Sequence, residues 1–371
     1  MINITLCDNL AEIDATAWDS LFGQDLPFCR HAFLSALEQG GSVGKNTGWL
    51  PQHLLLYRGE RLVAAMPMYL KLHSYGEYLF DWAIAEAYQQ HQLPYYPKLL
   101  CAIPFTPAEG QRLGVAPDEE PIEVFKLFYQ AILQRQQILG CSNFQCLYAD
   151  PPLQQIMRSN GMLERIDVQF QWYNHNFTNF ADFLATLPSR KRKQINKERL
   201  VVKRQGVEVK TFSGDNLPTD FWYQFVHFYQ ATYQKRSGHD GYLTPQTFML
   251  WAEYMAAEIV IFAAFVAGEL VAASLCFQSA NCLYGRYWGC NAEFDKLHFE
   301  CCYYAGIEYC IAKGLKRFDA GAQGEHKLKR GFLPVVRHGY YNFSPSPLVN
   351  AITDYCLRER QALLDYYQLT E

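Results

Sequence analysis

The sequence predicts an α+β protein with two tandem domains, each a mixed, mostly antiparallel sheet flanked by helices. Its length of 371 residues exceeds what a single hydrophobic core usually holds, which favours two domains. The same order of helical and strand patterns occurs twice along the chain. The hairpin pattern G-E-x-L-V-A-A of residues 59–65 nearly recurs as G-E-L-V-A-A at residues 268–273. We therefore expect one domain over residues 1–175 and a second over 176–371, with the boundary in the polar stretch 174–181.

In the first half, apolar residues three and four positions apart indicate helices, and short β-branched or aromatic runs indicate strands. Gly59 lies in the turn between two of these strands, and Gly140 ends the longest helix. The predicted elements are a helical region at 14–38, strands at 53–57, 62–70 and 99–103, a helix at 122–139, a strand at 143–148, a helix at 151–159 and a strand at 168–173.

The second half repeats this order, with helices around a meander of antiparallel strands. A helix follows the meander, ends at Gly314 and leads into a short strand. A final helix at 348–367 could pack on either domain. The other predicted elements are a strand at 207–212, helices at 221–235 and 245–257, strands at 259–266, 270–277 and 282–289, a helix at 299–313 and a strand at 317–320.

The composition is that of a globular protein rather than a disordered one, because half of the residues are hydrophobic and 15% are aromatic. The formal net charge of −4 argues against a DNA-binding surface. We find no signal-like leader and no apolar run of about 18 residues, so we expect a cytoplasmic protein without a transmembrane helix. Aromatic clusters leave peripheral membrane contact open. The twelve cysteines show no C-x-x-C spacing and are expected to be reduced and buried.

The segment F-D-A-G-A-Q-G-E-H-K-L-K-R-G-F at residues 318–332 concentrates residue types that carry chemistry. Glu325 and His326 can move protons, and Lys327, Lys329 and Arg330 can hold an anion. The glycines allow tight turns or a close approach of the backbone to a ligand. A solvated, salt-bridged loop would explain the same residues, so both interpretations stay open.

Three segments of the second half carry a resemblance to a known family. They are S-R-K-R-K-Q-I-N-K at 189–197 leading to G-V at 206–207, F-Y-Q-A-T-Y-Q-K-R at 228–236, and L-K-R-G-F at 328–332. In these segments the chain resembles the Fem-type peptidyltransferases, tandem GNAT proteins that build the interpeptide bridges of peptidoglycan from aminoacyl-tRNA. The resemblance implies two GNAT-like domains.

Over nearly its full length the chain is similar to the Fem-like proteins of Gram-negative bacteria. Those proteins are described as GNAT or peptidoglycan-biosynthesis proteins, so the resemblance indicates the group and not its reaction. The shared motifs are H-S-Y-G-E-Y at 73–78, F-D-W at 80–82, Y-Y-P-K at 95–98, P-F-T-P at 104–107 and G-E-H-K at 324–327.

The resemblance implies an N-acyltransferase that adds an aminoacyl or acyl group to an amine. Its donor would be acyl-CoA or aminoacyl-tRNA, and its acceptor would be a small-molecule or lipid-linked cell-wall precursor. Three departures argue against tRNA: the chain is acidic, no long helical arm is evident, and Leu328 stands where the better-known enzymes have an aromatic residue. The alternative is a non-catalytic module that binds a phosphate-bearing or peptide ligand in the same fold.

The family match selects Lys329 as the residue that stabilises the oxyanion or binds a diphosphate of the acceptor. Glu325 or His326 would remove the proton from the amine, with His298 and Glu300 as alternates. Adjacent residues of a strand point to opposite sides, so we expect only one of Glu325 and His326 to face the site.

We expect this segment to line a cleft beside the sheet of the second domain, with Lys329 within reach of the strand at 284–288. Arg286 and Tyr287 would be its neighbours on that strand. Together with Lys327 they would bind substrate through charge and through an aromatic surface.

Four basic residues occur in a row at 190–193. Arg190 and Arg192 would bind phosphate groups of a substrate, and a solvated helix face is the alternative interpretation.

Gln111 and Gly114 lie in Q-R-L-G-V-A at 111–116. This segment loosely fits Q/R-x-x-G-x-G/A, the GNAT loop whose backbone N–H groups hold the coenzyme A pyrophosphate. Pro117 and Asp118 separate it from the next helix, so a plain surface loop is the alternative.

His73, Glu77 and Asp81 are spaced at i, i+4 and i+8, which would place them on one face of a helix. The residues S-Y-G that follow His73 indicate a loop instead. We therefore expect no metal site there.

Overall fold

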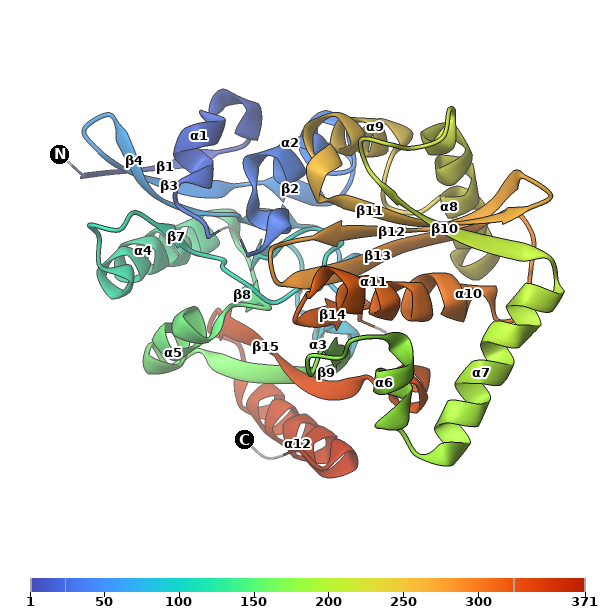
Figure 1. Ribbon diagram of the computed structural model, residues 1–371. Coiled ribbons are helices and arrows are strands. Elements are labelled where there is room, and N and C mark those ends of the chain that lie inside the picture. The colour runs from blue at the N-terminus through green and yellow to red at the C-terminus, as the bar shows by residue number, and fades with distance from the viewer. Residues whose placement is uncertain (1, 24, 323, 370–371) are drawn as a thin grey trace. The chain divides into compact units, whose positions relative to one another are not determined.

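The computed structural model confirms the α+β class with mixed sheets (Figure 1). It describes residues 2–23, 25–322 and 324–369. The sections below treat two compact units of the chain one at a time.

Unit 1 contains residues 1–168 and 336–371, and unit 2 contains residues 169–335. These units differ from the expected division at 175/176, because the chain leaves unit 1 at Val168 and returns to it at Val336. The strand expected at 317–320 is therefore not the last strand of the chain. A further strand, Leu333–Phe343, follows it and leads back to unit 1.

The strands of unit 1 form two sheets, and their bounds are β1 (Ile2–Cys7), β2 (Trp49–Pro51), β3 (His53–Arg58), β4 (Arg61–Met66), β5 (Tyr69–Lys71), β6 (Lys98–Cys101), β7 (Gly114–Val115), β8 (Asn143–Leu147) and β15 (Leu333–Phe343), the last of which begins in unit 2. One sheet has the order β1-β3-β4-β7 with antiparallel neighbours. In the other, β15-β8-β6-β5-β2, only β6 and β8 run parallel.

The helices of unit 1 are α1 (Ala15–Asp19), α2 (His31–Gln39), α3 (Trp82–Gln90), α4 (Pro121–Leu139), α5 (Pro151–Ser159) and α12 (Val349–Tyr367). Helix α4 begins at a proline, whose fixed φ suits the first turn, and ends at Gly140 with a left-handed φ of 63°. The C-terminal helix packs within unit 1, because Ile352 and Cys356 of α12 share a core cluster with Ile84 and Tyr88 of α3.

Unit 2 is built on one sheet in the order β10-β11-β12-β13-β14-β9. Only β13 and β14 run parallel, and the other neighbours are antiparallel. The bounds are β9 (Leu163–Tyr173), which begins in unit 1, β10 (Val207–Ser213), β11 (Ile259–Val266), β12 (Glu269–Gln278), β13 (Cys282–Cys290) and β14 (Arg317–Asp319).

The helices of unit 2 are α6 (Phe180–Ala185), α7 (Ser189–Arg204), α8 (Phe221–Ser237), α9 (Pro245–Tyr254), α10 (Leu297–Phe299) and α11 (Ala305–Lys313), with a π-helical turn, η4 (Glu300–Tyr304), between α10 and α11. Helices α8 and α9 cover one face of the sheet, and α10 to α11 cover the other (Figure 1). Consecutive residues of β13 face the two layers: the Tyr287 ring lies 5.8 Å from Tyr229 of α8, and the Trp288 ring lies 5.5 Å from His298 of α10.

The two hairpins that share the L-V-A-A pattern also share an irregularity. In β3–β4 the pairing shifts after Leu56 and leaves Val63 as an extra residue. In β11–β12 the pairing shifts after Ala264 and leaves Val271 as an extra residue. A β-bulge at the same place in the same pattern is what a duplicated hairpin would produce.

The twelve cysteines are all free thiols, and most of them are buried. Among the described residues, no helix combines the length and the apolar character needed to cross a membrane.

Candidate active site

The paired strands β13 and β14 separate inside unit 2. Their parallel pairing ends at Tyr284 and Asp319, where β14 stops and β13 continues to Cys290. Just past this point the register of β13 against β12 shifts and leaves Arg286 as the extra residue of a β-bulge. Bulges re-aim side chains and are common beside active sites. The C-terminal end of β14 and the bulged Arg286 therefore lie at the same point of the sheet in unit 2.

Arg286 and Asp319 form a buried ion pair at this place. Arg286 Nη1 lies 3.2 Å from Asp319 Oδ1, and each side chain is 2% exposed. The carboxylate also accepts the backbone N–H of Gly321 at 3.0 Å and the amide of Gln171 at 3.3 Å. The guanidinium lies 5.2 Å from the ring centroid of Tyr284. This set of contacts fixes the position of the cation and orients the loop that follows β14.

Lys327 follows β14 in the chain, and its side chain extends toward the Arg286–Asp319 pair. It lies in a 3-10 helix, η5 (Glu325–Arg330), and is 1% exposed. Its Nζ donates to the carbonyl oxygen of Gly321 at 2.6 Å. Burial lowers the pKa of Lys327 to about 8, with Asp319 raising it and Arg286 lowering it. The lysine is thus a cation that can lose its proton near neutral pH.

Two histidines with depressed pKa values stand beside this lysine. His326 Nε2 lies 2.8 Å from the hydroxyl of Tyr303, and burial with the nearby cations Arg330 and Lys327 lowers its pKa. Burial lowers the pKa of His298 to about 3. Both imidazoles are therefore neutral at pH 7, and a neutral imidazole can accept a proton.

Lys329 and Glu325 are exposed, and the Lys329 side chain has no hydrogen bond or ion pair with any described residue. This geometry differs from the expectation that Lys329 enters the cleft. A 3-10 helix has three residues per turn, which places Lys327 and Arg330 on the same buried side and Lys329 on the other. The strand-like alternation assumed for Glu325 and His326 does not apply, because both belong to this helix. Gln323 lies outside the described residues.

Arg330, expected as a residue that can hold an anion, makes contacts within unit 2 that hold the 3-10 helix in place. Its Nη2 lies 2.8 Å from Glu198 Oε1 on α7, its Nε donates to Tyr304 Oη at 3.0 Å, and its Nη1 donates to the carbonyl of His326. The guanidinium also lies 3.5 Å from the centroid of the Phe299 ring. Of the two basic residues in the K-R-G-F pattern at 329–332, Arg330 is therefore the buried one, and Lys329 is exposed.

The basic run at 190–193 lies at the start of α7, and its members have different environments. Arg190 is exposed. Lys191 donates to the carbonyl of Leu328 at 2.9 Å, and Arg192 donates to the carbonyl of Leu187 at 2.9 Å. Lys191 thus ties α7 to the segment that bears Lys327, and only part of the run is available to a ligand.

Gln111 and Gly114 contact the rest of unit 1. Gln111 Oε1 accepts the backbone N–H of Gly23, and Gly114 is a residue of strand β7. The backbone N–H groups of Val115 and Ala116 donate to protein carbonyls. An anion-binding loop needs such groups to point toward its ligand. The segment is therefore arranged as a strand rather than as an open pyrophosphate loop.

Tyr287 is buried among aromatic rings of α8 and α9 and does not lie on the Lys327 side of the sheet. Its ring contacts Tyr229, Phe248 and Trp251 at centroid distances of 5.8 to 5.9 Å. The bulge turns Arg286 away from this core, so the two residues expected to act together are separated by the sheet.

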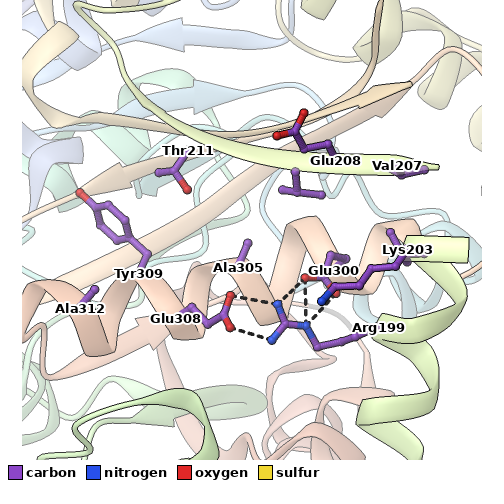
Figure 2. A pocket seen from close by; sticks show the side chains of 12 residues that line it. Arg199, Lys203, Val207, Glu208, Thr211, Glu300, Ala305, Glu308, Tyr309 and Ala312 are labelled. Carbon is purple, nitrogen blue, oxygen red and sulfur yellow. Dashed lines mark hydrogen bonds and ion pairs between the residues drawn. The ribbon is translucent and has the colours of Figure 1, made fainter. Parts of the chain in front are cut away.

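Glu300, an alternate proton acceptor, is paired with an arginine. A cavity of about 510 Å³ lies in unit 2, between β10 and α11 (Figure 2). In it Arg199 contacts both Glu300 at 2.8 Å and Glu308 at 2.7 Å. Burial raises the pKa of Glu300, and Arg199 opposes this shift. Arg199 already pairs with both carboxylates. These ion pairs join α7 to η4 and α11, and Glu300 is therefore not a free general base.

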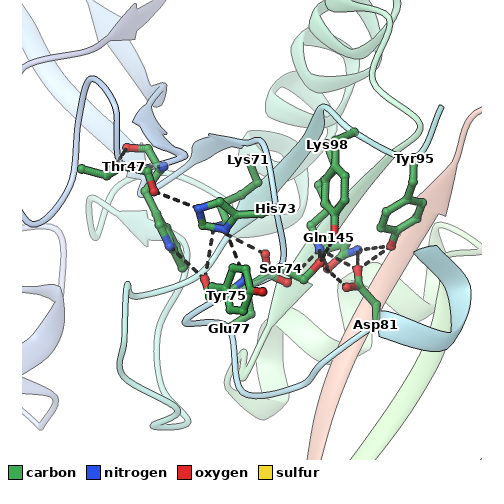
Figure 3. Close-up of polar contacts among 12 residues, drawn as sticks. Thr47, Lys71, His73, Ser74, Tyr75, Glu77, Asp81, Tyr95, Lys98 and Gln145 are labelled. Atoms are coloured by element: carbon green, nitrogen blue, oxygen red, sulfur yellow. Dashed lines mark hydrogen bonds and ion pairs between the residues drawn. The ribbon is translucent and has the colours of Figure 1, made fainter. Parts of the chain in front are cut away.

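A second polar cluster lies in unit 1 and gathers the motif residues of the first half (Figure 3). Lys98 Nζ lies 2.5 Å from Asp81 and 2.7 Å from Glu77, and Lys71 Nζ lies 3.7 Å from the other oxygen of Glu77. All four charged side chains are fully buried. His73 contacts this cluster through Nδ1, 3.4 Å from Lys71 Nζ, and its Nε2 lies 2.9 Å from the carbonyl of Thr47.

The charges of this cluster balance, with two lysines facing two carboxylates. Burial raises the pKa of Glu77 to about 7 and lowers that of Lys71 to about 7. Burial also disfavours the charged form of Asp81, but Lys98 and three hydrogen bonds outweigh it and hold its pKa at about 2. Within the part of the chain described, no group of His, Cys, Asp or Glu could hold a metal ion. The motifs at 73–78, 80–82 and 95–98 therefore contribute their charged residues, Glu77, Asp81 and Lys98, to a buried ion network.

A family model described as peptidoglycan biosynthesis/recognition matches residues 9–371. The chain belongs to the FemAB-like family. No curated protein matches it closely enough to count as a relative.

Solved structures resemble this FemAB-like chain in fold. FemX has a TM-score of 0.51 at 12% identity, over 95% of this chain and 100% of its own. The C-terminal domain of a candidate lysylphosphatidylglycerol synthetase from Agrobacterium fabrum has a TM-score of 0.54 at 10% identity, over 96% and 98%. L-PGS from Bacillus licheniformis has a TM-score of 0.51 at 11% identity, over 91% and 98%. At such identities the likeness concerns the fold alone.

Proposed function

We propose that this FemAB-like protein is an N-acyltransferase, with its reaction centre at the C-terminal end of β14. The observation that carries the proposal is the buried Lys327 amine beside the Arg286–Asp319 pair and the neutral His326. Buried cations beside a neutral base are what acyl transfer to an amine requires.

In the proposed reaction His326 takes a proton from the acceptor amine, and the amine nitrogen bonds to the carbonyl carbon of the donor. If His326 Nε2 donates to the Tyr303 hydroxyl, Nδ1 is left as the proton acceptor. The carbonyl oxygen becomes negative, and protonated Lys327 stabilises it. The bond from the carbonyl carbon to the leaving sulfur or oxygen then breaks, and the leaving group takes a proton.

The donor in this proposal is an acyl-CoA or an aminoacyl-tRNA, and the acceptor is the amine of a small-molecule or lipid-linked cell-wall precursor. The family description supports a cell-wall acceptor. Arg190, at the exposed start of α7, is the residue of the basic run that we propose for contact with a phosphate group.

Mass spectrometry of an amine-bearing peptidoglycan precursor, incubated with each donor class, tests the proposal. We expect one acyl group to be added, and Lys327→Met to reduce the rate by about 100-fold or more, as for loss of an oxyanion donor. Lys329→Met is the matched control, because Lys329 is exposed and should leave the rate within about twofold. Equal losses in both variants would contradict the assignment of Lys327.

The family description also names recognition, which favours a second candidate function: a binding module for the same precursor. If neither donor class is consumed and the precursor nevertheless binds in a Lys327-dependent way, this second function replaces the first.

A further inference from the structure

Unit 1 contains a cavity of about 600 Å³ that shares no lining residue with the proposed reaction centre. Its walls come from α5, β9, β15 and α12, which are remote from one another in sequence. Volumes of a few hundred to 1,000 Å³ are typical of small-molecule sites. The side chains of this cavity divide into a cationic group and an apolar group.

The cationic group surrounds a single carboxylate, Glu164. Its Oε1 accepts from Arg158 Nη2 at 2.9 Å and from the Tyr340 hydroxyl at 2.6 Å, and it lies 2.9 Å from His338 Nδ1. Arg360 pairs with the other oxygen. Burial disfavours the charge of Glu164, but hydrogen bonds from His338, Tyr340 and Arg158 outweigh it and hold its pKa well below the usual range.

The cavity therefore has an excess of positive charge. Two guanidinium groups face one ionised carboxylate, which leaves one net positive charge even with His338 neutral. The Arg158 side chain is 59% exposed, and within the described residues only its Nη2 has hydrogen-bond partners. Its Nε and Nη1 groups can donate to a bound molecule without breaking a contact of the fold.

The apolar group consists of Ile166 on β9, Val336 on β15 and Leu364 on α12. Ile166 and Leu364 are almost completely buried, which shows that the floor of the cavity is well packed. An inorganic anion would make no use of these side chains. A cation would be disfavoured by the net charge.

We propose that this cavity binds an amphipathic anion, a carboxylate or phosphate monoester attached to a short apolar chain. An oxygen of such a group can accept from the free Nη1 or Nε group of Arg158, and the chain would lie against Ile166, Val336 and Leu364. The proposal does not depend on acyl transfer, because no residue of the reaction centre takes part.

Calorimetry with octanoate and octyl phosphate tests this proposal, with octanol and octyltrimethylammonium as neutral and cationic probes. We expect the two anions to bind and the other probes to bind at least about tenfold more weakly. Binding of octyl phosphate alone would assign the site to phosphate monoesters, and binding of both anions would include carboxylates.

Arg158→Gln should weaken anion binding by about tenfold, and Leu364→Ser should weaken octyl phosphate but not inorganic phosphate. Arg61→Gln is the matched control, since Arg61 is another exposed arginine of unit 1 and pairs with Asp118. Arg158→Lys keeps the positive charge but loses the guanidinium N–H groups, and its affinity should fall between those of wild type and Arg158→Gln. Equal binding of octanol, or an unchanged affinity in Arg158→Gln with an unchanged melting temperature, would overturn the proposal.

Discussion

Arg286 and Asp319 join β13 to β14 where the two strands part, with 3.2 Å between Nη1 and Oδ1 and with both side chains almost fully buried. The pair has an effect beyond holding the strands. Asp319 raises the pKa of Lys327 and Arg286 lowers it, while burial is the largest influence and lowers it. The protonation of the proposed oxyanion donor therefore depends on its burial first and on Asp319 and Arg286 second.

Asp319→Asn should lower the pKa of Lys327 below about 8, because the variant removes the carboxylate that favours the charged lysine. The alkaline limb of the rate profile should move to lower pH. The free energy of unfolding should fall by about 3 kcal/mol, because Arg286 then loses a buried countercharge. Rate measurements across pH and urea unfolding check the two effects. Asp118→Asn, at an exposed pair with Arg61, is the control and should change neither; a similar shift in that variant would refute the explanation.

The wild-type rate should follow a bell-shaped curve against pH. Neutral His326 is required as the base and its pKa is lowered, so the acid limb should lie below pH 6.5. Protonated Lys327 is required as the oxyanion donor, so the rate should fall as pH rises through about 8. Lys327→Arg should move the alkaline limb upward, and His326→Gln should abolish the acid limb. A rate that keeps rising beyond pH 9 would instead identify neutral Lys327 as the base.

Much of the fold was predictable because period and turn signals were strong. The helix at 151–159 and the strand at 259–266 have the predicted bounds. Strand β15 (Leu333–Phe343) was not predicted, since R-H-G interrupts its apolar alternation. Without β15 the return of the chain to unit 1 at Val336 could not be inferred.

The segment of the candidate site was chosen from the sequence, but the sequence did not show which of its side chains are buried. The cluster of charges at 318–332 contains the buried Lys327, but the family match selected Lys329, which is exposed. Which lysine is buried depends on the three-residue period of a 3-10 turn and on the contact of Arg330 with Glu198. That contact joins positions far apart in sequence, so local pattern carried no sign of it.

Arg190→Glu and Arg192→Glu should behave differently, although both reverse a charge in the same run. Arg192 donates to the carbonyls of Ala185 and Leu187 at the end of α6, so its reversal should lower the free energy of unfolding by about 1 kcal/mol. Arg190 is exposed, and its reversal should leave stability unchanged but weaken the binding of acyl-CoA or tRNA and reduce its salt dependence. Filter binding at two salt concentrations and thermal melting separate the effects. Unchanged affinity in Arg190→Glu would make the run a solvated helix face.

Gly114→Ala should destabilise the protein whether or not coenzyme A binds. A Cβ at Gly114 would lie 2.7 Å from the Phe22 ring and 2.9 Å from Leu21 Cβ, so neighbouring atoms must shift at a cost of about 1–3 kcal/mol. Gly23→Ala is the control, because its Cβ would meet only the end of the Gln111 side chain, at 3.3 Å. Denaturant unfolding measures the difference, and acetyl-CoA titration of both variants measures binding. A stable Gly114→Ala protein that has lost acetyl-CoA affinity would restore the pyrophosphate-loop interpretation.

Lys98→Met should lower the free energy of unfolding by about 3–5 kcal/mol, because it leaves Asp81 and Glu77 buried without their shared cation. The loss should be smaller at low pH. Asp81 has a pKa of about 2 in the folded protein, below its unfolded value, so its contribution is present above pH 4 and disappears as pH falls toward 2.

Adding Asp81→Asn to Lys98→Met should recover part of the stability, since one uncompensated charge is removed. Urea unfolding at pH 7 and at pH 3 measures the wild type and both variants. Lys126→Met, at an exposed pair with Glu123, is the control and should be neutral. A loss in Lys98→Met that is equally large at both pH values would mean that packing of the lysine stem, and not charge balance, stabilises this network.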